Sequence, residues 1–220
     1  MRIIGTILFS IFVGFIFSCE IIDHHHAPKT ADEAVIELTE GNERFVNNKL
    51  QHHNFIDEAH LVEKDQHPHT FVLSCIDSRV PPEIVFDQGL GNLFVARVAG
   101  NIEDDNILGS MEYAVQVKGT KLLVILGHSN CGAVQGAIDN VNLGHLTQLT
   151  NQIKVAFSHH RTYPLPEHLT NEAGRLNVLS TIDHILSSSQ IIRELVNKKK
   201  IKIVGTFYDL HTGKVELLQS

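Results

Sequence analysis

The sequence contains no tryptophan and only three cysteines among its 220 residues. Three cysteines are too few for a disulfide framework or for a zinc module built on four thiolates. Basic residues are in the minority, and the formal net charge of −7 argues against nucleic acid as the main partner. Long polar tracts are also absent, and 43% of the residues are hydrophobic, which excludes global disorder. The composition therefore indicates one globular domain with a sizeable core.

Residues 1–18 have the pattern of an export signal. Met1 and Arg2 form a short cationic start, and residues 3–17 carry no charge and are rich in Ile and Phe. This apolar run is short for a membrane span and typical of a secretory signal, and a serine before Cys19 fits the bacterial lipoprotein pattern. We therefore expect a signal peptide of the lipoprotein type, a lipid on Cys19, and a periplasmic protein anchored to a membrane. A plain signal peptide and an uncleaved anchor are the alternatives.

Residues 19–29 are expected to be a polar tether between this signal and a single domain over residues 30–220. The tether contains His24, His25 and His26, and such exposed imidazoles bind transition metals weakly. A solvated linker is the simpler interpretation of this run. At the start of the domain, Thr30 and Glu33 have the spacing of a capping box, which predicts a helix beginning there.

Helical and strand patterns alternate through the rest of the domain. The continuous apolar run at residues 122–126 is typical of a strand covered on both faces. Strands that alternate with helices predict an α/β fold: a mainly parallel central β-sheet flanked by helices, with an N-terminal helical arm and a C-terminal antiparallel edge strand. The expected helices cover residues 30–47, 106–117 and 170–199, and the expected strands cover residues 70–75, 92–98, 121–128 and 201–208.

Two short motifs carry the chemistry, and each lies at the end of a predicted strand. Cys75 ends the first strand, and His128 ends the third, with Cys131 three residues later. Ligands of parallel α/β sheets gather beyond the carboxyl ends of the strands, so these side chains can meet. Two thiolates and one imidazole would hold zinc with its fourth position open, which is typical of a catalytic site. Taken singly, each cysteine could be a buried apolar residue and the histidine a structural one.

Together, the two motifs resemble those of the β-class carbonic anhydrases. The similarity extends to residues 80–83, 94–101, 109–114 and 208–213, and it covers roughly residues 30–218. The motifs themselves are Cys75-Ile76-Asp77-Ser78-Arg79 and His128-Ser129-Asn130-Cys131-Gly132.

This resemblance implies one Zn²⁺ per protomer, bound by Cys75, His128 and Cys131. The implied activity is the reversible hydration of carbon dioxide to bicarbonate and a proton by hydroxide on zinc. Because two thiolates cancel the formal charge of the dication, this zinc should be a weaker Lewis acid than one held by three histidines. Asp77 would accept a hydrogen bond from the hydroxide and orient it, and Arg79 would hold Asp77 in place.

The resemblance also implies a substrate pocket and an oligomer. Gln66 would hydrogen-bond the substrate, often across a dimer interface, and Phe94 and Tyr113 would line the apolar carbon dioxide pocket. Gly132 would offer its backbone N–H near the reacting oxygen, and its small size would let the chain turn closely past the metal. A homodimer or homotetramer is expected, with the N-terminal helix embracing its partner. Residues 113–118 contain no histidine, so the proton-transfer route stays open.

Three other interpretations compete with an open, active enzyme. In some family members the aspartate of the first motif moves onto zinc, so a closed, bicarbonate-regulated form is one of them; Gln66 favours the open form. A non-enzymatic zinc-binding lipoprotein is the second, suggested by the eight histidines between residues 24 and 69. A cysteine–histidine hydrolase is the third, but no recognisable oxyanion hole accompanies the two thiols.

Overall fold

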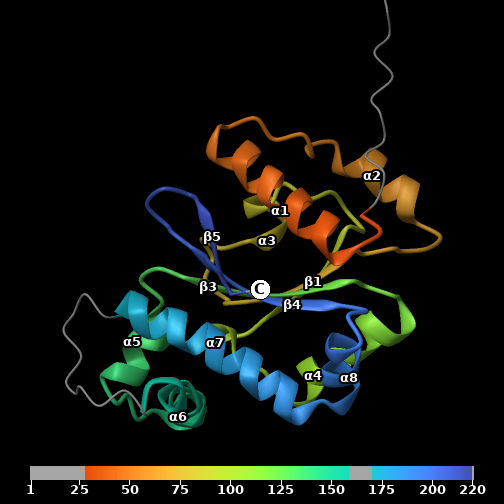
Figure 1. Cartoon of the computed structure of the whole chain (residues 1–220). Helices are drawn as coiled ribbons and strands as arrows, with labels where there is room; N and C mark the ends of the chain where they lie inside the picture. The colour runs from red at the N-terminus through yellow and green to blue at the C-terminus, as the bar shows by residue number, and fades with distance from the viewer. Residues whose placement is uncertain (1–27, 159–169, 220) are drawn as a thin grey trace, which may run out of the picture.

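A five-stranded sheet forms the centre of the molecule (Figure 1). The computed structural model describes residues 28–158 and 170–219. Within them the strands are ordered β2-β1-β3-β4-β5, and all neighbours are parallel except β4 and β5. The strand bounds are β1 Thr70–Ser74, β2 Leu93–Arg97, β3 Leu122–His128, β4 Lys202–Tyr208 and β5 Val215–Gln219. The prediction of a mainly parallel sheet with an antiparallel edge strand is confirmed.

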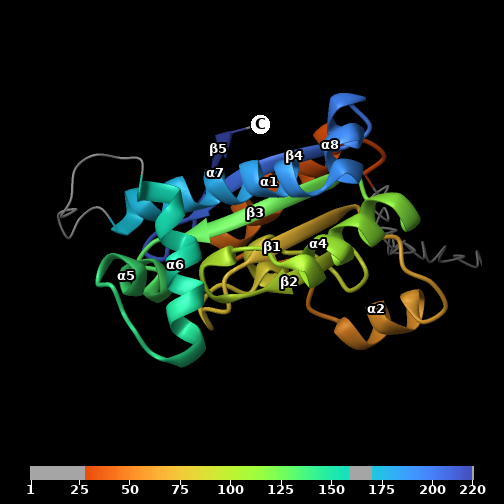
Figure 2. The same cartoon turned by 90° about the horizontal axis from the view of Figure 1, so that it is seen from below.

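Helices cover both faces of this sheet (Figure 1). Helices α1 and α3 lie on one face, and α4, α7 and α8 lie on the other. Helices α5 and α6 lie beyond the carboxyl ends of the strands, whereas α2 and α8 lie at the opposite end (Figure 2). The helix bounds are α1 Ala31–Val46, α2 Phe55–Val62, α3 Pro82–Val85, α4 Asp105–Glu112, α5 Gly132–Ile138, α6 Gly144–Ser158, α7 Thr170–Ser188 and α8 Gln190–Asn197.

All seven residues of strand β3 are buried, because helices pack against both faces of the sheet at this strand. Leu123 and Ile125 pack against the α7 and α8 side, in one core with Val178 and Ile192. Leu122 and its alternate neighbours pack against α1 and α3 in a second core. The uninterrupted apolar run in the sequence therefore corresponds to a central strand with a core on each face.

The predicted helix over residues 170–199 is two helices. It breaks at Ser189, whose backbone is extended (φ −102°, ψ 109°). The Ser189 hydroxyl then accepts a hydrogen bond from the Ile192 N–H at 3.1 Å and caps α8. A single serine within a helical pattern does not predict such a break. The prediction also missed α2, α3, α5 and α6, of which α2 has no buried residue and α3 has only four residues.

The N-terminal helix begins with the predicted capping box, which is confirmed. The Glu33 N–H donates to the Thr30 hydroxyl at 3.2 Å, and the Thr30 N–H donates to the Glu33 carboxylate at 3.3 Å. No helix in the described ranges has the length and apolar character needed to cross a bilayer. The predicted signal peptide and Cys19 lie outside the described residues.

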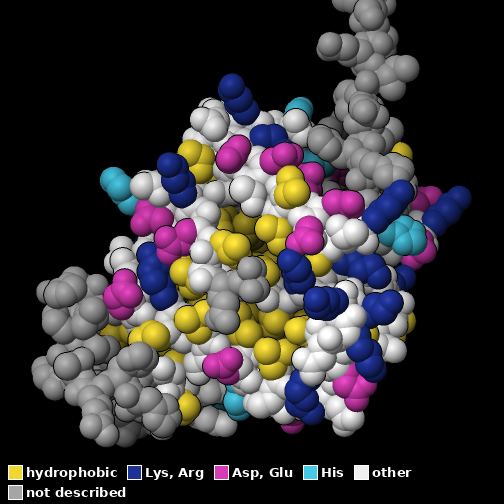
Figure 3. Space-filling view, in the orientation of Figure 1, with side chains coloured by type: hydrophobic (Ala, Val, Ile, Leu, Met, Phe, Trp, Pro, Cys, Tyr) yellow, Lys and Arg dark blue, Asp and Glu magenta, His cyan; other side chains and the backbone are white. Residues whose placement is uncertain are grey.

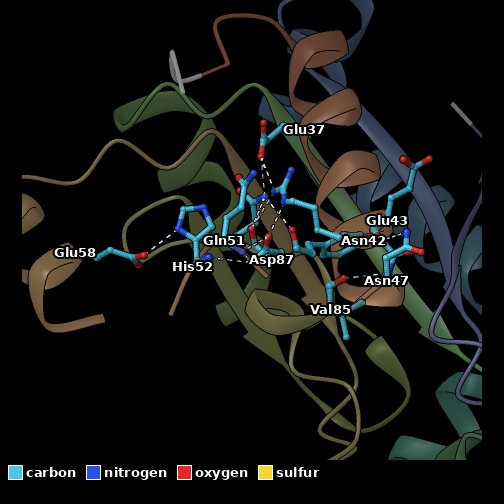
Figure 4. Close-up of polar contacts among 12 residues, drawn as sticks. Glu37, Asn42, Glu43, Asn47, Gln51, His52, Glu58, Val85 and Asp87 are labelled. Carbon is cyan, nitrogen blue, oxygen red and sulfur yellow. Dashed lines mark hydrogen bonds and ion pairs between the residues drawn. The ribbon is translucent and has the colours of Figure 1, made fainter. Parts of the chain in front are cut away.

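A partly buried ion pair fastens α1 to the chain that follows α3 (Figure 4). Arg44 donates from Nε to Asp87 Oδ2 at 2.5 Å, and the backbone amides of Gln51 and His52 also donate to the Asp87 carboxylate at 3.0–3.1 Å. Burial alone would raise the pKa of Asp87, but Arg44 and the two amides outweigh it and hold the pKa below its ordinary value. His52 in turn contacts Glu58 at 2.9 Å, which links the pair to α2.

Replacing Asp87 by asparagine is expected to lower the free energy of unfolding by about 3 kcal/mol at pH 7, because it leaves Arg44 without its buried partner. The residue has a φ of +46°, which asparagine tolerates, so the variant tests the charge. Since folding lowers this pKa, the stabilisation exists above the unfolded pKa and is lost as the pH falls through the folded one. Urea unfolding of wild type and variant from pH 7 to pH 3 should therefore show a shrinking difference. The exposed Asp183→Asn is the control, and an equal loss there would contradict the assignment.

Candidate functional site

The two chemical motifs meet at the carboxyl edge of the sheet. Strands β1 and β3 are neighbours, with Ser74 opposite Leu126, so the residues that follow them lie side by side. Cys75 follows β1, His128 ends β3, and Cys131 is the residue before the first turn of α5. Their ligand atoms all lie within 4.8 Å of one another, and all three residues are buried. The structure thus brings together the three predicted metal ligands.

His128 presents a free nitrogen to this cluster. Its Nδ1 lies 2.9 Å from the carbonyl oxygen of Ser129, which can only accept a hydrogen bond. Nδ1 therefore carries the proton, and Nε2 carries a lone pair. Nε2 is fully buried and has no hydrogen-bond partner among the described residues. A buried acceptor without a partner is costly, and a metal ion is the group that would satisfy it.

The two thiols differ in acidity because they touch. Their Sγ atoms are 3.9 Å apart. The contact with Cys131 lowers the pKa of Cys75 to about 4, despite the opposing effect of burial. The same contact, with burial, raises the pKa of Cys131. Without a cation, only one of the pair ionises readily, so a bound dication is needed to keep both as thiolates. The donor set, two thiolates and an imidazole nitrogen, fits Zn²⁺.

Asp77 lies beside the ligands and is held by Arg79. Arg79 donates from Nε to Oδ1 at 2.9 Å and from Nη2 to Oδ2 at 2.6 Å, and its backbone N–H adds a third bond at 3.0 Å. These contacts keep the pKa of Asp77 well below its ordinary value. Its Oδ2 is 3.9 Å from His128 Nε2, so the carboxylate borders the metal-ligand nitrogen. The predicted Asp77–Arg79 pair is therefore formed, and it is bidentate.

Arg97 is a site residue to which the sequence analysis gave no role. From the end of β2 it donates to the carbonyl oxygens of Cys75 at 2.9 Å and Asp77 at 2.6 Å. It therefore fixes the backbone of the turn that carries one ligand and the carboxylate. The sequence signal was only its place near the end of a predicted strand, because the sheet register that sets Arg97 opposite Ser74 is seen only in the structure. Gly100 adds a backbone N–H that donates to Cys75 Sγ at 3.4 Å.

Gly132 starts α5 directly after Cys131. Within the described chain, an added Cβ at Gly132 would meet no atom within 4 Å, and the residue does not have a positive φ. The chain's own packing therefore does not require glycine here, and the expectation that its small size lets the chain pass closely by the metal stays a prediction. Its position next to a ligand is as predicted, and the space in front of it is open.

Phe94, Tyr113 and Gln66 lie away from the metal ligands of their own chain. The rings of Phe94 and Tyr113 meet edge to face with centroids 6.1 Å apart, and both line a surface hollow of about 550 Å³. Phe94 pairs with Phe71, which lies four strand residues, or roughly 13 Å, before Cys75. Gln66 precedes β1, and its loop is joined to the end of the π-helix Tyr113–Val117 by the Asp65–Lys118 ion pair at 2.9 Å. These three residues therefore gather toward the opposite end of the sheet.

Comparison with known proteins agrees with this site. Residues 70–215 match the carbonic anhydrase family model. The chain is 36% identical over 186 residues to carbonic anhydrase 2 of Mycobacterium tuberculosis, covering 82% of this chain and 89% of that protein, and equally similar to a carbonic anhydrase of Mycolicibacterium smegmatis. It superposes on a tetrameric β-carbonic anhydrase of Sordaria macrospora with a TM-score of 0.66 and 26% identity, covering 84% of this chain and 93% of the other. The chain belongs to the β-class carbonic anhydrase family.

Proposed function

We propose that this protein catalyses the reversible hydration of carbon dioxide to bicarbonate and a proton, with one Zn²⁺ held by Cys75, His128 and Cys131. The observation that carries the proposal is the buried three-ligand cluster with the Asp77 carboxylate beside it. The named relatives, all carbonic anhydrases, support it. When bound, zinc supplies a Lewis acid that makes water nucleophilic near neutral pH.

The chain's own residues would orient the reaction. Asp77 stays ionised because Arg79 holds its pKa low, so it can accept a hydrogen bond from the attacking water oxygen and fix its direction. Arg79 and Arg97 keep the carboxylate and its backbone in place. Gly132 begins α5 directly after Cys131. Its backbone N–H would donate a hydrogen bond to the negative charge that develops on the reacting oxygen.

The state of Asp77 supports an open site over the closed, regulated form. Both of its oxygens are engaged by Arg79, so closing the site by moving Asp77 onto the metal would break two charge-assisted hydrogen bonds. We expect the zinc-loaded protein to hydrate carbon dioxide at pH 7, measured by stopped-flow with a pH indicator. A steep loss of rate below about pH 8 that alkali restores would instead indicate the closed form. No hydration at any pH, with zinc bound, would contradict the proposed function.

We also propose that a second copy of the chain completes the substrate pocket. Gln66, Phe94 and Tyr113 lie away from the metal ligands of their own chain. Phe94 and Tyr113 line an open hollow, and Tyr113 is 45% exposed. The nearby α2 has no buried residue and exposes Ile56 and Leu61, which is typical of a surface that a partner covers. The tetrameric state of the Sordaria relative supports such an assembly.

This arrangement predicts complementation between two inactive variants. Cys75→Ser removes the metal site, and the double variant Gln66→Ala/Tyr113→Ala removes the partner's contribution. If these residues act across the interface, each mixed dimer has one intact site, and refolding an equal mixture should restore about a quarter of wild-type hydration. The control is the mixture of Cys75→Ser with Cys131→Ser, which should stay inactive. Failure of the first mixture to recover, with mixed dimers present, would place these residues in their own chain's chemistry.

Export and lipidation at Cys19 remain a proposal that rests on the apolar residues 3–17 and the Ser-Cys junction. Labelling with a palmitate analogue tests it directly.

A further inference from the structure

Five lysines gather at the amino-terminal ends of β3 and β4. Lys121 precedes β3, Lys202 begins β4, and the N–H of Lys202 donates to the carbonyl oxygen of Lys121 at 3.0 Å. The turn between α8 and β4 adds Lys198, Lys199 and Lys200, all exposed. We refer to these five residues as the lysine cluster.

The lysine cluster makes this part of the surface positive, although the net charge of the protein is negative. Lys198 pairs with Glu194 at 2.9 Å, and Lys202 pairs with Asp32 at 2.5 Å. Lys121, Lys199 and Lys200 have no ion pair within the described part of the chain. Figure 3 shows Lys and Arg side chains concentrated on the right of the view, over α8 and the start of β4. With a formal net charge of −7 for the whole chain, this surface has the opposite sign to the average.

The chain enters the domain beside this surface. The Asp32–Lys202 pair joins the first turn of α1 to the start of β4, and Lys29 is exposed just before α1. Glu20 to Lys29 can span at most ~35 Å when fully extended. A bilayer that holds the apolar residues 3–17, or a lipid on Cys19, would therefore lie within reach of the lysine cluster.

From this charge and this entry point, we propose that the lysine cluster is a docking surface for an anionic lipid bilayer. Each lysine near such a surface strengthens binding by roughly fivefold at physiological ionic strength. The metal ligands lie at the other end of the sheet, since Lys121 and His128 are separated by the full length of β3, roughly 23 Å. Docking would thus leave the candidate active site facing away from the lipid. This inference is independent of the proposed catalytic function.

Vesicle flotation of the full chain tests the proposal. Vesicles of phosphatidylcholine alone measure binding through the apolar N-terminal residues, and vesicles with an equal part of phosphatidylglycerol add the charge-dependent component. We expect the anionic vesicles to bind more wild-type protein, and the excess to disappear in high salt. The triple variant Lys121→Gln/Lys199→Gln/Lys200→Gln should lower the anionic partition coefficient by roughly 100-fold. Its partition onto phosphatidylcholine should not change.

A matched triple variant separates the surface from net charge. Lys49, Lys154 and Lys214 lie outside the lysine cluster, and changing all three to glutamine removes the same charge. This control should bind anionic vesicles like wild type. Equal losses in both triple variants, or no excess binding to anionic vesicles, would overturn the proposal. The triple variant of the lysine cluster is also tested for binding to duplex DNA. If it lost DNA binding but kept its binding to anionic vesicles, the proposal would be overturned and the lysine cluster would be assigned to nucleic acid.

Discussion

Replacing Cys75 by serine is expected to abolish stoichiometric zinc binding and to lower carbon dioxide hydration by ~1000-fold or more. A serine hydroxyl is far less acidic than a thiol and stays protonated, whereas the contact with Cys131 lowers the pKa of the Cys75 thiol and favours the thiolate. The two remaining donors, His128 Nε2 and the Cys131 thiol, cannot hold the ion as firmly, since even the loss of an outer partner of a ligand costs 10–100-fold in affinity. Zinc content by mass spectrometry and stopped-flow hydration, on the same preparations, measure both effects.

The third cysteine of the chain provides the matched control. Cys19→Ser removes a thiol that lies outside the described residues and in neither motif, so it should keep one zinc per protomer and wild-type hydration in purified protein. The result also separates the enzyme from a non-enzymatic zinc-binding lipoprotein. If the histidine-rich N-terminal region were the main zinc site, Cys75→Ser would keep most of its zinc. That outcome would contradict the assignment of the ligands.

The metal ligands could be predicted from the sequence because they lie in short motifs at the ends of recognisable strands. Each strand ends at a residue readable from its apolar run, and in a parallel sheet those ends lie on one edge. The step that needed more than periodicity was the adjacency of β1 and β3, because the paired residues Thr70 and Leu122 lie 52 positions apart in the sequence.

Other parts of the site could not be predicted from the pattern of the chain. The role of Arg97 depends on the register of β2 against β1, which no local signal sets. The family resemblance assigns Phe94 and Tyr113 to the substrate pocket. Their separation from Cys75 of the same chain depends on the strand lengths and on the order of the strands, which only the structure gives. The break at Ser189 depends on a hydroxyl that caps one helix where another ends, and serine does this only in certain backbone conformations.

Replacing Asp77 by asparagine is expected to lower the turnover number by ~100-fold while zinc content stays at one per protomer. Asparagine is uncharged, and its NH₂ group would face one of the two Arg79 donors that now bind carboxylate oxygens at 2.6 and 2.9 Å. The side chain would lose both its charge and its fixed direction, whereas the three ligands would be untouched. Because the pKa of Asp77 lies well below its ordinary value, wild type is ionised throughout pH 6 to 9, and the ratio of rates should not vary with pH in that range.

Two further variants make this prediction specific. Arg79→Lys keeps the positive charge but loses the bidentate contact, so its turnover should fall between wild type and Asp77→Asn. Glu83→Gln neutralises an exposed carboxylate in the nearby α3 and should leave turnover unchanged. If Asp77→Asn lost zinc in proportion to activity, its effect would be on the metal site. If it lost neither, the orienting role would be wrong, and the proximity of Asp77 Oδ2 to His128 Nε2 at 3.9 Å would have only a structural meaning.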